Sequence, residues 1–317
     1  MQKPLVAVIL GPTATGKTRL SVELASMQNG EIISADSMQI YKRMDIGTAK
    51  PTIEERRDVP HHMMDVAEPC EAFSVASYVK AAKDCIDGVL ERDRLPIIVG
   101  GTGLYITSLI DNVQFADIGE DLEYRQSLAD ISKEQGTELL WSKLEKIDPV
   151  MALKISKNDE KRIIRALEVY YLTKMPMSHF VAKSKETPSP YDFIQIGLAY
   201  NDREKLYAAI NQRVDIMTER GLIDEVRTLI MSGVPVDSTA MQAIGYKELI
   251  AHINGEMMLD EALERIKQES RRYAKRQLTW FRRDKSINWF EVDVTVFDDV
   301  IKQSVELIIN ARGMKAV

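Results

Sequence analysis

One segment near the start of the chain limits the possible folds more than any other. It reads GPTATGKT over residues 11–18, after an uncharged apolar run at residues 5–10 and before a helical pattern at residues 19–27. This order matches the loop G-x-x-x-x-G-K-[ST], in which backbone N–H groups and the next helix surround a phosphate oxygen. A buried strand, a phosphate-binding loop and a helix are therefore predicted in that order.

The loop also predicts a set of phosphate-binding residues. Lys17 supplies a positive charge, and Thr18 supplies a hydroxyl group suited to a magnesium ion, Mg²⁺. ATP, GTP or another diphosphate would satisfy the same donors, so the loop leaves its ligand open. The predicted diphosphate-binding residues are Gly11, Pro12, Thr13, Ala14, Thr15, Gly16, Lys17 and Thr18.

Composition places the chain among ordinary globular enzymes. Its 317 residues are 45% hydrophobic and 28% charged, and this length predicts roughly two domains. The formal net charge of −6 means that a nucleic-acid site would need a local basic patch. Cys70 and Cys85 form no C-x-x-C pair, and no segment approaches the ~18 apolar residues of a membrane span. We expect a cytoplasmic monomer without disulfides, structural zinc or membrane segments.

Apolar runs predict four further strands, at residues 31–35, 96–99, 193–200 and 287–292. From about residue 112 helical patterns replace strands, until the strand pattern returns near residue 193. The fold class predicted is therefore α/β, with a core made of residues 1–112 and 191–317 and an all-helical insertion domain at residues 113–190. The longer predicted helices cover residues 75–92 (capped by Ser74), 122–135, 137–147, 159–172, 203–219, 222–231 and 259–283.

At the ends of two predicted strands lie residues that can be explained either by function or by structure. Asp36 follows the second strand, at the edge where open α/β sheets bind ligands, but a carboxylate there is equally suited to capping a turn. The third strand ends in Gly100 and Gly101, where many nucleotide hydrolases have an aspartate that binds magnesium. That difference argues against ordinary ATP hydrolysis. The glycines fit a close approach to a ligand and a tight turn equally well.

Basic residues gather at three places. The largest group lies in residues 264–285, which hold nine basic residues against three acidic ones, with a predicted buried face of Ala274, Leu278 and Phe281. Such an excess within an acidic chain favours contact with a polyanion such as RNA, whereas isolated charges usually belong to a solvated surface. Its predicted contact residues are Arg271, Arg272, Lys275 and Arg276. The other two groups are Lys161 with Arg162 and Arg165, and Arg213 alone.

Seven motifs occur in order along nearly the whole chain: GPTATGKT, DSMQIYKRMDIGTAKP, PHHMMD, GGTGLYI, KRIIRALEVYY, MQAIGYKE and RRYAKRQLTWFR. Together they resemble the bacterial tRNA dimethylallyltransferases, also called tRNA isopentenyltransferases. The resemblance implies a P-loop NTPase-like parallel sheet flanked by helices, a helical insertion domain and a requirement for Mg²⁺. It also implies transfer of the dimethylallyl group from dimethylallyl diphosphate to N6 of adenosine 37 in the anticodon stem-loop of tRNA.

The resemblance also assigns roles to individual residues. Asp36 matches the family's general base, and Lys17, Thr18 and Arg213 are further catalytic residues that hold the diphosphate, with Thr18 as the Mg²⁺ ligand. The residues matched to tRNA contacts are Asp36, Ser37, Met38, Gln39, Thr102, Arg125, Lys161, Arg162, Ile163, Ile164, Arg165, Met241 and Gln242. The family often has glutamine at the position of Lys161, so a phosphate contact is expected there instead of a base-specific one. No Cys/His cluster suggests the zinc finger found in eukaryotic relatives.

Three other functions are compatible with the loop. A small-molecule kinase would use Lys17 and Thr18 on ATP, but the glycine-ended strand and the basic stretch argue against it. A transferase acting on free adenine nucleotides would keep the same chemistry, although the helical insertion favours a macromolecular acceptor. A GTPase would need a guanine-reading N/T-K-x-D motif, which the sequence does not contain.

Overall fold

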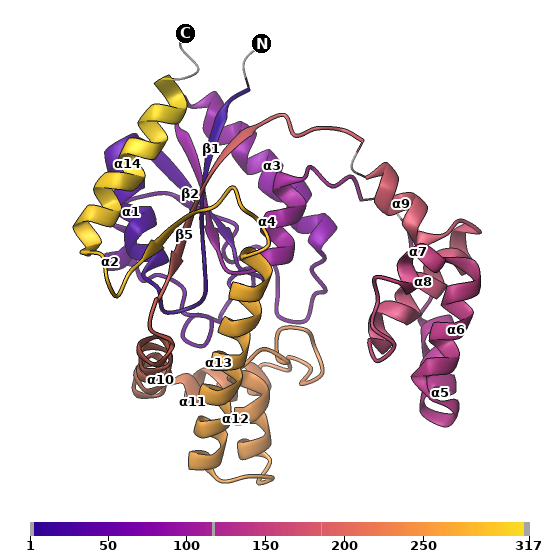
Figure 1. Cartoon of the computed structure of the whole chain (residues 1–317). Helices are drawn as coiled ribbons and strands as arrows, with labels where there is room; N and C mark the ends of the chain where they lie inside the picture. The colour runs from indigo at the N-terminus through magenta and orange to yellow at the C-terminus, as the bar shows by residue number, and fades with distance from the viewer. Residues whose placement is uncertain (1–2, 116–117, 185, 314–317) are drawn as a thin grey trace. The chain divides into compact units, whose positions relative to one another are not determined.

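The computed structural model describes residues 3–115, 118–184 and 186–313. Its central element is a six-stranded parallel sheet with the strand order β3-β2-β4-β1-β5-β6 (Figure 1). The chain places β2 and β4 on one side of β1 and β5 on the other, so the strand order reverses beside β1. The strands are β1 (Leu5–Leu10), β2 (Gly30–Ala35), β3 (His61–His62), β4 (Leu95–Gly100), β5 (Asp192–Ala199) and β6 (Asn288–Glu291).

Helices cover both faces of the sheet, and the side chains of β1 show why. Val6 and Val8 pack into one hydrophobic core together with residues of α3 and α4, whereas Ala7 and Ile9 pack into another with residues of α1 and α14. Because side chains alternate along a strand, a continuous apolar run is the pattern of a strand buried on both sides. These helices are α1 (Lys17–Gln28), α3 (Val75–Glu91), α4 (Gly103–Ile110) and α14 (Phe297–Gly313).

A further hydrophobic core joins the long loop after β2 to a group of helices in the second half of the chain. Ile40 and Tyr41 of that loop are buried in the same cluster as Val226 and Leu249. The phosphate-binding loop also contacts this region, since Ala14 packs with residues of α10 and α13. The short helix α2 (Ile53–Arg56) lies within the loop, and the group consists of α10 (Arg203–Glu219), α11 (Leu222–Met231), α12 (Tyr246–Ile253) and α13 (Leu259–Phe281).

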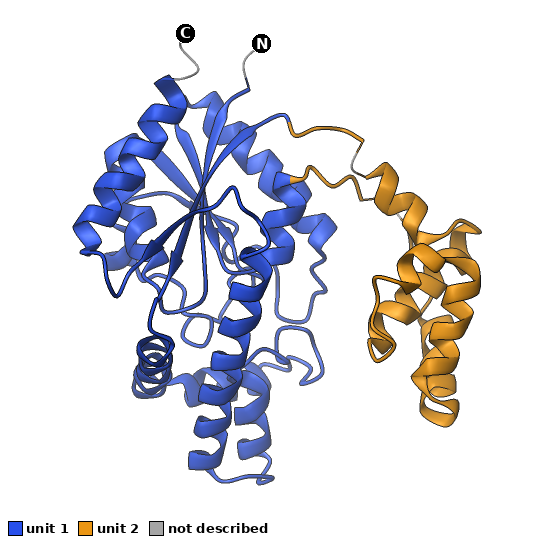
Figure 2. Cartoon of the chain, in the orientation of Figure 1, with its two compact units in different colours: residues 1–110, 190–317 blue, residues 111–189 orange. Residues whose placement is uncertain are grey.

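Residues 111–189 form a second compact unit, made of helices, while residues 1–110 and 190–317 form the first (Figure 2). The second unit has its own hydrophobic core, which includes Leu140 and Leu144 of α6 and Ile163 and Leu167 of α8. We call it the insertion unit, and the other the α/β unit. Its helices are α5 (Leu122–Gln135), α6 (Thr137–Ile147), α7 (Pro149–Ala152), α8 (Glu160–Thr173) and α9 (Met177–Lys183).

The structure confirms the predicted fold class, an α/β protein with a parallel sheet and an all-helical insertion. All five predicted strands are present within two residues of their predicted ends, and Ser74 caps α3 by accepting a hydrogen bond from the Ser77 N–H. The sequence patterns missed β3, α2, α4, α7, α9, α12 and α14. Most of these are too short to produce a clear period, whereas α14 has a regular apolar stripe. None of the described helices is both long and apolar enough to cross a membrane.

Candidate active site

A cavity of about 940 Å³ lies in the α/β unit where β1, β2 and β4 end. It is lined by the phosphate-binding loop, by residues 36–39 after β2 and by Arg213 of α10. Tyr273 and Arg276 of α13 also line it. The predicted catalytic residues therefore come together at one cavity, although they are separated by up to 196 residues of sequence. They are Lys17, Thr18, Asp36 and Arg213.

The phosphate-binding loop is held in shape by its own side chains and by packing that only glycine permits. Gly11 has a φ angle of 141°, and a Cβ atom there would lie 2.2 Å from the carbonyl oxygen of Leu198. Within the loop, Thr15 Oγ1 donates to the Pro12 carbonyl at 2.9 Å, and Lys17 Nζ donates to the same carbonyl at 2.5 Å. Helix α1 begins at Lys17, so its N-terminal N–H groups lie beside the loop and favour an anion there.

Among the charged residues that line the cavity, Lys17, Arg213 and Asp36 influence one another directly. Burial lowers the pKa of Lys17 to about 7; the positive charge of Arg213 lowers it as well, while Asp36 raises it. Burial also lowers the pKa of Arg213, and the carboxylates of Asp36 and Glu55 act in the opposite direction. An anionic ligand bound by both cations would reduce their mutual repulsion and offset their desolvation. The electrostatics of the cavity therefore favour a polyvalent anion such as a diphosphate.

Asp36 closes a turn and faces the cavity at the same time. Its Oδ1 accepts hydrogen bonds from the backbone N–H groups of Met38 at 2.9 Å and Gln39 at 3.4 Å. The residue is half-buried and lines the cavity. The structural role considered from the sequence is therefore present. Since these bonds use Oδ1, the second carboxylate oxygen is left to accept a proton from a substrate.

Gln39, which is predicted to contact tRNA, uses its side-chain amide for hydrogen bonds within the chain. Ser34 Oγ donates to Gln39 Oε1 at 3.0 Å, and Gln39 Nε2 donates to the carbonyls of Thr48 at 3.2 Å and Ala49 at 3.3 Å. Both ends of the amide thus hold the loop after β2 in place. A base contact by this amide would require these hydrogen bonds to break.

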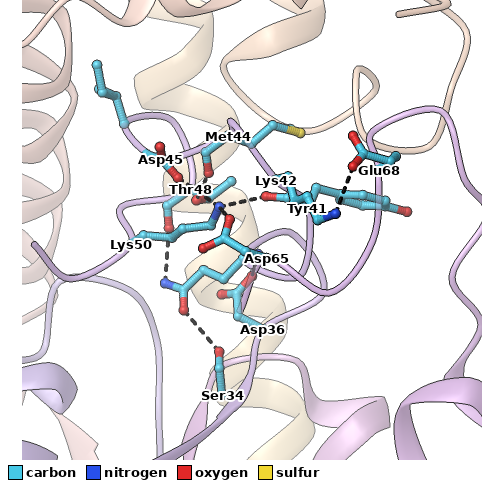
Figure 3. A network of polar contacts seen from close by, with 12 residues as sticks. Ser34, Asp36, Tyr41, Lys42, Met44, Asp45, Thr48, Lys50, Asp65 and Glu68 are labelled. Carbon is cyan, nitrogen blue, oxygen red and sulfur yellow. Dashed lines mark hydrogen bonds and ion pairs between the residues drawn. The ribbon is translucent and has the colours of Figure 1, made fainter. Parts of the chain in front are cut away.

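Lys50 holds the same loop from inside. Its side chain is only 3% exposed, and its Nζ donates to Asp65 Oδ1 at 2.6 Å, to Asp45 Oδ1 at 2.8 Å and to the Tyr41 carbonyl at 2.6 Å (Figure 3). A buried ammonium group is tolerated when carboxylates and carbonyls satisfy its donors in this way. The loop that carries Asp36 is therefore a fixed part of the fold.

Glu225 of α11 anchors the next part of the loop. Its Oε2 accepts hydrogen bonds from the backbone N–H groups of Asp45 and Ile46, both at 2.8 Å. Its Oε1 accepts from the Gly47 N–H at 3.0 Å and from the Tyr246 hydroxyl at 2.6 Å. One carboxylate thus binds three consecutive backbone amides, which ties the loop to helices α11 and α12.

Helix α13 packs against both the phosphate-binding loop and the turn after β4. Gln277 Oε1 accepts a hydrogen bond from the Thr13 N–H at 3.2 Å, and its Nε2 donates to the Gly101 carbonyl at 2.9 Å. A Cβ atom on Gly101 would lie 2.1 Å from that Nε2, and one on Gly103 would lie 2.5 Å from the Trp280 ring. Packing of α13 therefore explains these two glycines.

Thr102 links α13 to the turn formed by Asp36. Its Oγ1 accepts a hydrogen bond from the Ser37 N–H at 3.0 Å, and it is also hydrogen-bonded to Tyr273. Burial, reinforced by the charge of Asp36, raises the pKa of Tyr273 to about 12, so its hydroxyl stays protonated at neutral pH. Of the residues predicted to contact tRNA, those that line the cavity are Asp36, Ser37, Met38, Gln39, Gln242 and Arg276.

The side chains of three residues that are predicted to contact tRNA lie in hydrophobic cores. Ile163 is fully buried and Ile164 nearly so in the core of the insertion unit, and Met241 is fully buried in the core formed with α11 and α12. Their side chains are packed against other apolar groups and do not face solvent. Contact of these three residues with tRNA stays a prediction.

The predicted basic contacts of the insertion unit divide into paired and free side chains. Arg125 Nε and Arg165 Nη1 both bind the buried carboxylate of Glu168, at 2.9 Å and 2.5 Å. Arg162 pairs with Asp159 at 2.5 Å, whereas Lys161 is exposed. The two arginines around Glu168 therefore have a structural role of their own, whatever else they contact.

The basic residues of α13 also differ among themselves. Arg271 Nη1 donates to Asn211 Oδ1 at 2.6 Å, and Arg272 pairs with Glu269 at 2.5 Å. Lys275 is exposed, and Arg276 lines the cavity. The predicted basic stretch is thus one helix with an exposed cationic side. Its helix ends at Phe281, two residues before the predicted end.

Four residues that shape the site were not identified from the sequence: Lys50, Glu225, Tyr273 and Gln277. Gln277 lies three positions after Ala274, on the face of α13 that is predicted to be buried. A polar amide on an otherwise apolar buried face indicates a residue with hydrogen-bond partners inside the protein, and this pattern could have identified Gln277. Lys50 and Glu225 gave no such signal, because Asp65 lies 15 residues from Lys50 and Asp45 lies 180 residues from Glu225.

The parallel sheet, the glycine-rich loop and the charges around the cavity define a P-loop protein whose site combines an anion cradle with a carboxylate. Two family models match the sequence: IPP transferase over residues 39–284 and isopentenyl transferase over residues 4–65. The first match covers well over half of the chain. The chain belongs to the IPP transferase family.

Individual relatives agree with this assignment. The chain is 52% identical over 289 residues to the tRNA dimethylallyltransferase of Caldanaerobacter subterraneus subsp. tengcongensis, covering 91% of this chain and 92% of the relative. It is 49% identical over 309 residues to that of Acetivibrio thermocellus, covering 98% of both chains.

Solved structures agree as well. The tRNA isopentenylpyrophosphate transferase of Bacillus halodurans superposes with a TM-score of 0.74 at 45% identity, covering 99% of this chain and 98% of that chain. A eukaryotic dimethylallyltransferase acting on tRNA gives a TM-score of 0.81 at 30% identity, covering 97% and 80%. The family predicted from the seven motifs is confirmed.

Proposed function

We propose that the protein transfers the dimethylallyl group of dimethylallyl diphosphate to N6 of adenosine 37 in the anticodon loop of tRNA, and releases diphosphate. One observation carries this proposal: the anion cradle, two cations and the carboxylate of Asp36 line a single cavity. The names of the relatives support the choice of donor and acceptor, since they are tRNA dimethylallyltransferases. A cytoplasmic enzyme that acts as a monomer is part of the proposal.

The reaction places separate demands on the acceptor and on the leaving group. The lone pair of the exocyclic adenine amine is delocalised into the ring, so the amine becomes a good nucleophile only as it loses a proton. In the proposed step, N6 forms a bond to the first carbon of the dimethylallyl group while the bond from that carbon to the diphosphate oxygen breaks. The proton passes from N6 to the carboxylate of Asp36.

The leaving diphosphate carries the charge that develops in this step. Lys17, Arg213 and the N–H groups of the phosphate-binding loop are the donors on this side of the cavity. Preorganised donors of this kind stabilise a transition state because they need little rearrangement as charge develops. The loop would therefore hold a diphosphate that leaves intact, because the bond that breaks joins its oxygen to the dimethylallyl carbon. No phosphoryl group would be transferred.

Mg²⁺ fits the cavity when it binds together with the diphosphate. Thr18 lines the cavity and offers a hydroxyl oxygen, while no group of three or more His, Cys, Asp or Glu side chains in the described ranges could hold a metal ion. Magnesium commonly completes its coordination with substrate phosphates and water, which suits this donor set. When bound, it would neutralise charge on the diphosphate. Thr18 would hold it there.

The acceptor base must leave the anticodon loop to reach Asp36. Enzymes that modify a nucleobase commonly rotate it out of its stack into a pocket, and a single-stranded loop lowers the free energy required. Ser37, Met38 and Gln242 line the cavity and are the proposed contacts of the extruded base. Lys161, Lys275 and Arg276 are proposed to contact RNA phosphates, which would position the tRNA without reading its sequence.

A small-molecule kinase is the alternative that the loop alone would permit. Against it, β4 ends at Gly100, which packs against Ala35 of β2, and Gly101, which packs against α13, follows it, so no carboxylate occupies the position that usually binds the magnesium of ATP. Asp36 lines the same cavity, which supports a role for its carboxylate in taking up a proton from the acceptor. ATP-dependent phosphorylation of a metabolite without prenyl transfer would establish the kinase.

The test is incorporation of a labelled dimethylallyl group into RNA by the purified full-length protein. An anticodon stem-loop with adenosine at position 37 should be labelled in buffer containing magnesium, and the same RNA with guanosine there should not. Transfer to AMP but not to the stem-loop would overturn the acceptor assignment. Omission of magnesium with EDTA should abolish labelling, and unchanged labelling would remove the metal from the proposal.

A further inference from the structure

Gln277 of α13 makes polar contacts with both segments that border the phosphate end of the cavity, the phosphate-binding loop and the turn after β4. Its side chain is 6% exposed, and both ends of its amide bond backbone groups: the Thr13 N–H and the Gly101 carbonyl. Thr13 is 264 residues away in sequence. The amide therefore joins the phosphate-binding loop to the turn after β4 through a third, distant element.

The residue after Thr13 has restraints of its own, because Ala14 packs with α10 and α13 and its carbonyl accepts a hydrogen bond from the Tyr200 hydroxyl at 3.4 Å. The internal hydrogen bonds of the loop from Thr15 and Lys17 both end on the Pro12 carbonyl, so they fix the curl of the loop but not its position relative to the sheet. Gly11 is fixed by its contact with Leu198. Without the Gln277 amide, the Thr13 N–H would lose its acceptor in a part-buried place, which favours a shift toward water.

We propose that Gln277 is a positioning residue for the diphosphate cradle, and that it acts through the backbone of Thr13. The inference rests on the proposed function, in which the loop holds the diphosphate of the prenyl donor. Gln277 itself borders the cavity through its amide, while the donors to the diphosphate are the loop N–H groups and Lys17. Its contribution is to keep those donors in the geometry that binds the diphosphate before the donor arrives.

This role predicts a particular kinetic change. The loop holds the diphosphate both in the bound substrate and in the transition state. A displaced loop therefore weakens the binding of the diphosphate in both states to a similar extent. A loss shared by the two states raises KM and leaves kcat nearly unchanged. A merely structural defect would instead reduce the fraction of folded enzyme, which lowers apparent kcat and leaves KM unchanged.

The main variant is Gln277→Met, which fills a similar volume but has no amide. We expect KM for dimethylallyl diphosphate to rise about tenfold, as for one buried donor left without a partner, with kcat and RNA affinity within about threefold of wild type. Thr279→Ala is the matched control, because Thr279 is an exposed residue of the same helix that donates only to the Lys275 carbonyl. It should leave KM unchanged.

Hydrogen–deuterium exchange of a peptide covering residues 11–18 tests the loop directly. Exchange should be faster in Gln277→Met, whereas Gln277→Glu keeps an acceptor for the Thr13 N–H and should exchange as slowly as wild type. Unchanged KM together with unchanged loop exchange in Gln277→Met would overturn the proposal. So would equally fast exchange in both variants, since the bond to Thr13 would then not be the restraint.

The proposed function and this inference fail in different ways. If the wild-type protein transfers no dimethylallyl group to RNA, the proposed function fails. Calorimetric titration with inorganic diphosphate then still compares wild type with Gln277→Met, and equal affinities would overturn the positioning role. If the wild type is active and the variant keeps its KM, only the positioning role fails.

Discussion

Two sites of this protein use basic side chains in opposite ways: the cavity of the α/β unit and the buried Glu168 of the insertion unit. In the α/β unit, Lys17 and Arg213 line the cavity, and within the described residues neither lies at salt-bridge distance from a carboxylate. In the insertion unit, Arg125 and Arg165 both bind Glu168, whose side chain is completely buried. The first arrangement leaves positive charge available to an anionic ligand. The second uses positive charge to hold helices and loops together.

The largest expected effect belongs to the insertion unit. Glu168→Ala would leave two arginines without their buried partner, and such a change commonly lowers the free energy of unfolding by about 3–5 kcal/mol. Denaturant unfolding followed by circular dichroism measures this loss. Glu269→Ala removes the partner of the exposed Arg272 and is the control, with an expected change below ~1 kcal/mol. Equal, small losses of unfolding free energy in both variants would show that the ion pairs of Glu168 stabilise the protein no more than an exposed pair does.

The next effect belongs to the cavity. Asp36→Asn keeps an oxygen that can accept the Met38 N–H but cannot take a substrate proton, so kcat for prenyl transfer should fall roughly a hundredfold or more. Stability and diphosphate affinity should stay close to wild type, because the turn is retained. Single-turnover transfer and calorimetry separate the two quantities. Wild-type turnover in Asp36→Asn would remove Asp36 from the mechanism.

The dependence of diphosphate binding on pH sharpens the comparison further. The pKa of Lys17 in the free protein is about 7, and a bound diphosphate stabilises the charged form. Binding therefore takes up a proton above pH 7, so affinity should be flat just below pH 7 and fall by up to about tenfold per pH unit above it. Calorimetry with dimethylallyl diphosphate in buffers from pH 6 to about 9 measures this.

Lys17→Arg is the control for this pH dependence, because arginine keeps its charge throughout the range. The decline in affinity above pH 7 should be absent or much weaker in this variant. The free wild-type protein should also gain stability as pH rises from about 7 toward 10.5, since the folded state favours the neutral lysine and the unfolded state does not. Parallel pH profiles in the two proteins would refute the assignment to Lys17.

The smallest expected effect concerns RNA binding by α13. Lys275 is exposed on the cationic side of the helix, so Lys275→Ala should weaken RNA binding modestly and lower the slope of log affinity against log salt by about one. Filter binding of an anticodon stem-loop at several salt concentrations measures the slope. Lys302→Ala on α14 removes another exposed lysine and should leave it unchanged. Identical slopes in wild type and both variants would show that the exposed cationic side of α13 does not contact RNA.

The parts of the fold that could be predicted are those with a distinctive local sequence pattern. The run LVAVIL and the loop GPTATGKT predicted β1, its loop and α1, because a strand buried on both sides and a glycine-rich turn have distinct local sequences. The two-residue strand β3 could not be predicted in this way. It forms because His61 and His62 pair with Ile32 and Ile33, an interaction that spans about thirty residues.

The same distinction applies to individual residues of the site. Lys17, Thr18 and Asp36 stand in or beside the glycine-rich loop and the strand end, so their residue types and spacing marked them. Ile163, Ile164 and Met241 lie in motifs that resemble the family, but a motif does not tell which of its side chains face the core. Burial in the hydrophobic cores of the two units decided that question.

Neighbouring residues are enough to specify the phosphate-binding loop, the strand that precedes it and the basic character of residues 264–285. The tertiary structure alone decided which charges are free and which are paired. Arg213 reaches the cavity because α10 packs beside the loop, whereas Arg165 is paired because Glu168 is buried beside it. Electrostatic interactions depend on distance in space and on burial, and a linear sequence contains neither.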